Sequence, residues 1–157
     1  MFATSSMIRQ VRSSDASETR LLGSRLAAVA QPGDLLCLWG DLGAGKTVFA
    51  KGFGAGLGVP GTVTSPTFIL MAEHEGRLPL FHVDLYRLAD ASDALAGGLL
   101  DERRAGGVTL VEWPDRLGDA LPDDRLDIEI AGTGDDSRTI TLRAGTPRMA
   151  RYLVAAG

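Results

Sequence analysis

The segment Gly40–Thr47 (GDLGAGKT) constrains the fold of this chain more than any other feature. A continuous apolar run, LLCLW from Leu35 to Trp39, precedes it, and a helix-length stretch beginning at Lys46 follows. An apolar run of this kind is typical of a strand buried on both faces of a parallel sheet. Because parallel strands need a long crossover connection, usually a helix, the sequence predicts a strand–loop–helix unit at this point.

The same segment fits the Walker A pattern G-x-x-x-x-G-K-[ST] in full. Its glycines let successive backbone N–H groups point at phosphate oxygens, and the helix that follows adds its free N-terminal donors. The ammonium of Lys46 can reach the β- and γ-phosphates, and the hydroxyl of Thr47 can bind magnesium. We therefore predict that the chain binds the phosphates of a nucleoside triphosphate. The predicted cofactor-binding residues of this segment are Asp41, Leu42, Gly43, Ala44, Gly45, Lys46, Thr47 and Val48.

The absence of one residue type favours ATP over GTP. The usual guanine-reading motif is Asn/Thr-Lys-x-Asp, but the chain contains no asparagine. Its two lysines, Lys46 and Lys51, are not followed two places later by aspartate.

The remaining pattern mixes strands with helices. Asp15 and Glu18 have the spacing of a capping box and introduce an amphipathic helix. Helices are expected over 16–30, 46–57, 90–95 and 99–104, with a terminal helix or frayed tail over 146–156. Strands are expected over 7–11, 35–39, 68–71, 78–83, 108–111, 126–130 and 138–142, with two hairpins among them. These elements predict an α/β, three-layer P-loop fold with a mixed, mostly parallel central sheet, in one domain spanning 1–157 with a core of about 14–142.

Two acids end strands that are expected to flank the loop. Asp84 follows the apolar run LPLFHV, and Glu112 follows VTLV. A magnesium-dependent hydrolase needs carboxylates at such strand ends, one to complete the metal shell and one to orient the attacking water. The residues alone leave open which acid has which role, and a helix cap or a solvated surface group is the alternative for each.

Other candidate residues carry weaker signals. Thr64, Ser65 and Thr67 place hydroxyls on a loop that could sense the γ-phosphate, although an ordinary turn is slightly favoured. Cys37 is interpreted as a small buried hydrophobe and Trp113 as a packing residue. His74 and His82 show no spacing typical of a zinc site.

The overall charge and hydropathy exclude several classes of protein. The net charge is −4, from 16 basic and 20 acidic residues, which argues against independent nucleic-acid binding. No apolar stretch reaches the roughly 18 residues of a membrane span, and the first residues lack a secretory apolar core. A single cysteine excludes an internal disulfide. These features predict a cytoplasmic protein with no membrane association.

The chain resembles the TsaE (YjeE) family in four motifs that occur in order: GDLGAGKT, TSPTF, HVDLYRL and VEWPDRL. Members of this family are small P-loop ATPases of bacterial tRNA threonylcarbamoyladenosine (t6A) biosynthesis. The resemblance covers about residues 14–142. It implies that ATP and Mg²⁺ are the cofactors, that TsaB and TsaD are the partners, and that tRNA is contacted only through the complex. Asp115 stands where the family commonly has glutamate, and the basic tail from Pro147 has no assigned role.

The resemblance also implies roles for individual residues. Thr47 and Glu112 correspond to the magnesium ligands, and Asp84 to an acid that helps in hydrolysis. Residues 64–67 correspond to a switch-like loop, and positions near the adenine or ribose correspond to Ala16, Ser137 and Arg138. With Lys46, the acids Asp84 and Glu112 form the predicted catalytic set. Two alternatives stay open: a small-molecule kinase, with Arg103-Arg104 as weak support, and a nucleotide-regulated binding module without meaningful turnover.

Overall fold

The structure is a computed structural model, and it describes residues 7–41, 43–61, 71–86 and 106–157. The described strands are β1 (Ile8–Ser13), β2 (Leu35–Trp39), β3 (Met71–His74), β4 (Leu80–Asp84), β5 (Val108–Glu112), β6 (Leu126–Ala131) and β7 (Arg138–Ala144). The described helices are α1 (Ala16–Ala27), α2 (Lys46–Gly56) and α4 (Arg151–Ala155), with 3₁₀ segments η3 (Pro114–Ala120) and η4 (Pro147–Ala150).

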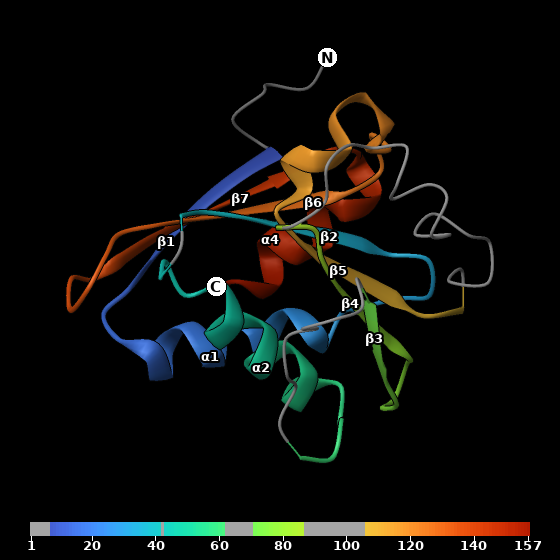
Figure 1. Cartoon of the computed structure of the whole chain (residues 1–157), viewed down its shortest axis with the longest axis horizontal. Coiled ribbons are helices and arrows are strands. Elements are labelled where there is room, and N and C mark those ends of the chain that lie inside the picture. The colour runs from blue at the N-terminus through green and yellow to red at the C-terminus, as the bar shows by residue number, and fades with distance from the viewer. Residues whose placement is uncertain (1–6, 42, 62–70, 87–105) are drawn as a thin grey trace.

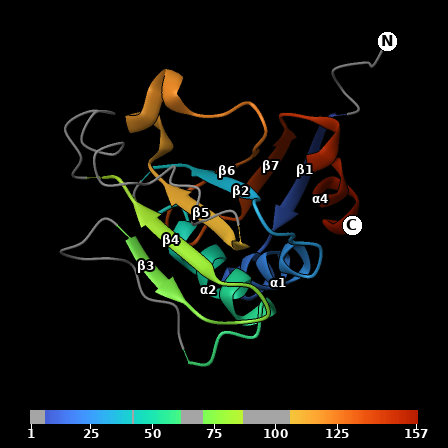
Figure 2. The same ribbon diagram turned by 90° about the vertical axis from the view of Figure 1, so that its right-hand side faces the viewer.

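The seven strands form one sheet in the order β1-β7-β6-β2-β5-β4-β3. Strand β2 pairs in parallel with β5 and β6, and β4 pairs in parallel with β5. The outer pairs β1–β7, β6–β7 and β3–β4 are antiparallel. The predicted α/β fold with a mixed, mostly parallel central sheet is therefore confirmed, and the parallel pairs lie at the centre of the sheet. Figure 2 shows β3 and β4 at one side of the sheet and β1 at the other.

Helices α1 and α2 cover one face of the sheet (Figure 1). Their apolar side chains, among them Leu26, Phe49 and Phe53, join those of the strands in one buried cluster. The two helices approach closely because glycines line their contact: a Cβ built on Gly52 would lie 2.0 Å from the carbonyl oxygen of Arg20. This packing fixes α1 and α2 against each other on that face of the sheet.

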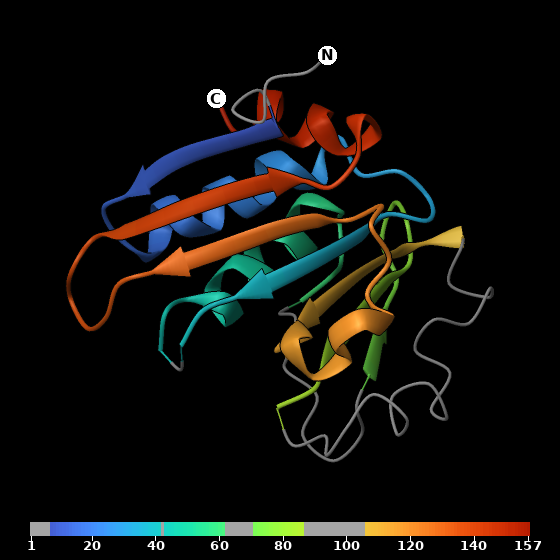
Figure 3. The ribbon, with the colours of Figure 1, turned by 90° about the horizontal axis from the view of Figure 1, so that it is seen from above.

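Segment η3 lies on the opposite side of the sheet from α1 and α2 (Figures 1 and 3). Its Leu117 packs with Leu35, Cys37, Val83 and Val111 in a second buried cluster. Alternation along β2 explains the division, because side chains at successive positions point to opposite faces. Cys37 is fully buried in this cluster, as predicted, and burial raises the pKa of its thiol.

The end of the chain is docked, which settles the choice between a terminal helix and a frayed tail. Tyr152 of α4 is fully buried, and its hydroxyl donates to the carboxylate of Asp34, whose side chain is 0% exposed. Arg151 donates to the same carboxylate, and Nη1 of Arg148 lies 2.8 Å from its Oδ1 as an ion-pair contact. The basic tail, which had no role in the sequence interpretation, thus pairs with a buried acid beside β2.

The structure shifts some predicted boundaries. Helix α1 ends at Ala27 instead of residue 30, because residues 28–34 turn back toward β2 through bonds such as Asp34 N to Gln31 O. The strand expected over 68–71 is described only from Met71 and continues to His74, opposite β4. The helices predicted over 90–95 and 99–104 lie outside the described residues. In the described part of the chain, no helix is long and apolar enough to cross a membrane.

Candidate functional site

The loop before α2 bends through three glycines in the left-handed region. Gly40, Gly43 and Gly45 have φ values of 150°, 81° and 114°, which L side chains rarely adopt. At Gly40 a Cβ would also lie 2.7 Å from the carbonyl oxygen of Ile130. Gly45 is the N-cap of α2 and offers no side-chain cap, so the first N–H groups of the helix stay available to an anion.

Lys46, the first residue of α2, is folded inward. Only 5% of its surface is exposed, and its Nζ donates to the carbonyl of Gly40 at 2.6 Å. The same atom lies 3.5 Å from the centre of the Trp113 ring. Burial lowers the pKa of Lys46, while the carboxylates of Glu112 and Asp84 act in the opposite direction. The ammonium is thus held at the loop, with acids around it.

The two predicted acids lie side by side at the carboxyl edge of the sheet. Asp84 of β4 and Glu112 of β5 are paired positions in the parallel register, and Glu112 also neighbours Leu38 of β2. A cavity of about 320 Å³ joins these acids to the loop. It is lined by Gly43, Gly45, Lys46, Thr47, Val48, Asp84, Tyr86, Glu112 and Trp113. Residues predicted separately from three segments therefore meet in one cavity.

Glu112 has a partner that sequence reasoning missed. Its carboxylate Oε2 lies 2.6 Å from Nε2 of His82, which is fully buried in β4. From the sequence, His82 shows no spacing typical of a zinc site and carries no predicted role. Side chains alternate between the two faces of a strand with a period of two residues, so His82 and Asp84 must share one face of β4. This spacing is the sequence signal that could have placed His82 near the acids.

Trp113 is also more than a packing residue. It is the one residue other than glycine with a positive φ (59°) in the described part of the chain. A bulky residue in this conformation is strained by about 1–3 kcal/mol, and such strain persists where the surroundings impose it. The indole ring lies against Lys46 Nζ, and its centre is 4.9 Å from that of the Tyr86 ring. The strained turn therefore places an aromatic wall on the lysine side of the cavity.

A second cavity, of about 300 Å³, brings Ala16 and Arg138 to the loop from two distant segments. Gly43, Gly45 and Val48 line the same cavity. Nε of Arg138 donates to the carbonyl of Ala44 at 2.8 Å, and Nη2 donates to that of Gly43 at 3.3 Å. Arg138 thus braces the loop as well as lining the space beside it.

Ser137 is placed differently from its neighbour. It does not line the second cavity, and its hydroxyl accepts a hydrogen bond from Nη2 of Arg12 at 2.8 Å. This bond joins the β6–β7 hairpin to β1. The predicted nucleotide contacts at Ala16, Ser137 and Arg138 all stay predictions. Ala16 and Arg138 line the second cavity, and Ser137 does not.

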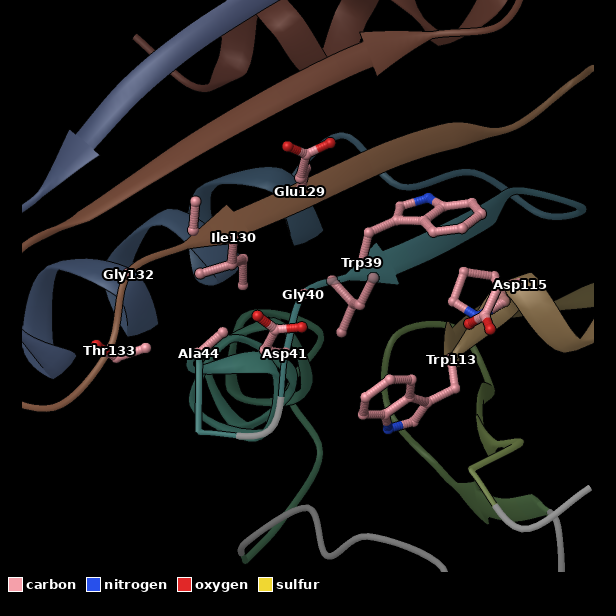
Figure 4. Close-up of a pocket in the computed structure, with 13 residues that line it drawn as sticks. Trp39, Gly40, Asp41, Ala44, Trp113, Asp115, Glu129, Ile130, Gly132 and Thr133 are labelled. Carbon is pink, nitrogen blue, oxygen red and sulfur yellow. The ribbon is translucent and has the colours of Figure 1, made fainter.

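Asp41 belongs to a third cavity, of about 410 Å³, on the flank of the loop (Figure 4). Trp39, Trp113, Asp115 and Glu129 also line this space. Among the described residues that line it, every charged side chain is acidic, so this cavity is a poor place for a phosphate. Leu42 and the predicted switch residues Thr64, Ser65 and Thr67 lie outside the described residues.

The donors around the first cavity suit magnesium. A threonine hydroxyl (Thr47) and two carboxylates (Asp84 and Glu112) are hard oxygen ligands. In the described part of the chain, no group of three or more His, Cys, Asp or Glu side chains could hold a metal ion. Mg²⁺ is usually bound by one or two carboxylates together with the phosphates of a substrate, so this donor set fits that ion.

Comparisons with known proteins agree with this geometry. The family described as "Threonylcarbamoyl adenosine biosynthesis protein TsaE" matches residues 13–140. A TsaE protein of Bacillus subtilis is 49% identical over 85% of this chain and 84% of its own length. A TsaE protein of Treponema pallidum is 38% identical over 83% of this chain and 96% of its own length. The crystal structure of Bacillus subtilis YdiB superposes with a TM-score of 0.77, at 40% identity, over 95% of this chain and 93% of that one.

Proposed function

Because the chain belongs to the TsaE family, we propose that it is the ATP-binding and ATP-hydrolysing subunit required for t6A modification of tRNA, acting with TsaB and TsaD. The observation that carries the ATPase part of this proposal is the 320 Å³ cavity in which Lys46, Thr47, Asp84 and Glu112 meet. A glycine-rich loop, an ammonium and two strand-end carboxylates are the parts that phosphoryl transfer to water requires.

The phosphates of the nucleotide would bind inside the glycine-rich loop Gly40–Thr47. Backbone N–H groups at residues 43–48 would bind the phosphate oxygens, and Lys46 would exchange its bond to the Gly40 carbonyl for the β- and γ-phosphates. The second cavity, which Ala16 and Arg138 line, would take the adenosine end of the nucleotide. Ser137 directly precedes Arg138 in the β6–β7 hairpin and would add a contact to the same end.

The acids would divide the remaining work. Thr47 and Glu112 would hold Mg²⁺, which when bound neutralises charge on the phosphates. Asp84 would accept a hydrogen bond from the attacking water and orient it. Its Oδ1 already accepts a bond from the backbone N–H of Tyr86 at 3.0 Å, which fixes the carboxylate at the cavity wall. Thr64, Ser65 and Thr67 would respond to the γ-phosphate as a switch loop.

A cytoplasmic location and indirect contact with tRNA follow from the same proposal. The net charge of −4 favours a partner-mediated role over direct binding of an RNA backbone. Slow hydrolysis by the isolated chain and faster hydrolysis with TsaB and TsaD are expected.

The test is nucleotide binding, hydrolysis and cellular t6A content of three variants. Lys46→Ala should weaken ATP binding by about 10- to 100-fold, because a charge-assisted bond to phosphate is lost. Asp84→Ala and Glu112→Ala should keep ATP binding in the absence of Mg²⁺ but lose hydrolysis and t6A formation. If both acid variants restored t6A fully in a deficient strain, the chain would be a nucleotide-regulated binding module instead. Unchanged ATP affinity in Lys46→Ala would overturn the proposal.

A further inference from the structure

We propose that His82 is a positioning residue that orients Glu112 for its magnesium role, an inference that rests on the function proposed above. The pair is held by the contact of 2.6 Å between His82 Nε2 and Glu112 Oε2. His82 is 0% exposed and does not line the 320 Å³ cavity, so it acts on the site through Glu112 alone.

The sheet register explains why the two side chains meet. Glu112 is paired with Asp84, and His82 is paired with Leu110, so Glu112 and His82 are diagonal neighbours on adjacent parallel strands. Residues two apart share a face, which places His82, Asp84, Leu110 and Glu112 on the same face of the sheet. That face is the one covered by α2, because Leu80 and Leu110 belong to the buried cluster that contains Phe49.

The hydrogen bond has a direction. We assign the proton of this bond to Nε2 of His82, which then donates to the carboxylate oxygen Oε2 of Glu112. The other ring nitrogen, Nδ1, is buried and has no hydrogen-bond partner among the residues that the structure describes. The bond to Glu112 is thus the polar contact that sets the orientation of this ring.

The consequence for Glu112 is a fixed side chain. Glu112 is only 4% exposed, and one of its two carboxylate oxygens is hydrogen-bonded to the buried His82. Glu112 also lines the 320 Å³ cavity, together with Thr47. Partners behind a ligating carboxylate orient it, and their loss typically costs about 10- to 100-fold in metal affinity.

The experiment compares magnesium dependence in variants of the full chain. His82→Leu removes the donor at similar volume, and His82→Gln restores an N–H donor near the Nε2 position. His74→Leu is the matched control, because His74 is a second histidine with a buried ring nitrogen, Nε2, which has no hydrogen-bond partner in the described part of the chain. The readouts are the affinity for fluorescent ATP without metal, and the Mg²⁺ concentration that gives half-maximal enhancement of that binding.

We expect His82→Leu to raise the half-maximal Mg²⁺ concentration about tenfold, with the metal-free ATP affinity changed by no more than about twofold. His82→Gln should recover most of the difference, and His74→Leu should leave both values unchanged. A folded His82→Leu protein with the magnesium dependence of the unaltered chain would overturn the inference. It would leave the proposed function intact, because that function is tested separately by Lys46→Ala, Asp84→Ala and Glu112→Ala.

A second measurement uses the unaltered protein, so it holds even where His82→Leu does not fold. Nitrogen-15 NMR of the histidine rings should show the Nε2–H tautomer for His82 and a shift of its Nε2 resonance when Mg²⁺ is added to the ATP complex. The His74 resonances should shift less. A proton on Nδ1 of His82, or no response of this ring to Mg²⁺, would contradict the proposal.

Discussion

Replacing Asp34 by alanine should destabilise the protein by about 3 kcal/mol. The carboxylate is fully buried and receives bonds from Arg151, from the Tyr152 hydroxyl and from the backbone N–H of Gln31 at 2.9 Å. Arg148 adds an ion-pair contact at 2.8 Å. The substitution removes the carboxylate that three side chains of η4 and α4 contact, those of Arg148, Arg151 and Tyr152.

The magnitude follows from what is left behind. Tyr152 is fully buried, and burial together with the bond to Asp34 raises the pKa of its hydroxyl, so it stays a neutral donor without an acceptor. An orphaned buried donor costs about 1–3 kcal/mol, and breaking a buried ion pair costs about 3–5 kcal/mol. The side chains of Arg148 and Arg151 are 40% and 21% exposed, so both can turn partly to water, which favours the lower end of that range.

The assay is urea unfolding followed by circular dichroism, with the melting temperature as a second measure. A loss of about 3 kcal/mol corresponds to a fall of about 6–12 °C for a domain of this size. Asp124→Ala is the control, because Asp124 contacts the same Arg148 at 3.1 Å but has a side chain 47% exposed. Its loss should cost no more than about 1 kcal/mol. Equal effects of the two substitutions would refute the reasoning, since burial would then not decide the cost.

Three further predictions concern the loop and the helix that follows it. Arg138→Ala should weaken ATP binding about tenfold by fluorescence titration, because two donors to the loop carbonyls are lost, and Arg138→Lys should recover little since it lacks the fork. Burial lowers the pKa of Lys46, so the affinity for ATP without magnesium should fall as the pH approaches 10.5 from below. In Glu112→Gln this fall should begin at a lower pH, because the carboxylate that raises the pKa of Lys46 most is gone. An affinity that stays constant to pH 10.5 would contradict this. Gly52→Ala should lower the free energy of unfolding in urea by about 2 kcal/mol, because the added Cβ would lie 2.0 Å from the Arg20 carbonyl oxygen. This loss outweighs the better helix propensity of alanine. Gly106→Ala is the control, because a Cβ at Gly106 meets open space and should change the stability little.

Local pattern was sufficient to find the central strand, the loop and the helix. Strand β2 has the predicted bounds Leu35–Trp39, and α2 begins at the predicted Lys46. Buried runs, glycines and capping residues act over a few neighbouring positions, so the amino-acid order alone carries this information. The same order marked Asp84 and Glu112 as strand-end acids, since each follows an apolar run directly.

Pairing across the sheet was decided by the tertiary structure. The register that sets Asp84 beside Glu112, and Glu112 within reach of His82, joins residues about thirty positions apart. The bonds from Arg138 to the loop span more than ninety positions. No local periodicity encodes which strands become neighbours, because that choice depends on packing the whole core at once.

The sequence by itself therefore determined that this chain has a glycine-rich loop of the Walker A pattern between a buried strand and a helix, with two acids at the ends of nearby strands. Only the tertiary structure decided which side chains surround Lys46, what role Trp113 takes, and how Asp34 engages the basic tail. The physical reason is that a loop conformation follows from local backbone chemistry, whereas the burial and partners of a charge depend on segments brought together by folding.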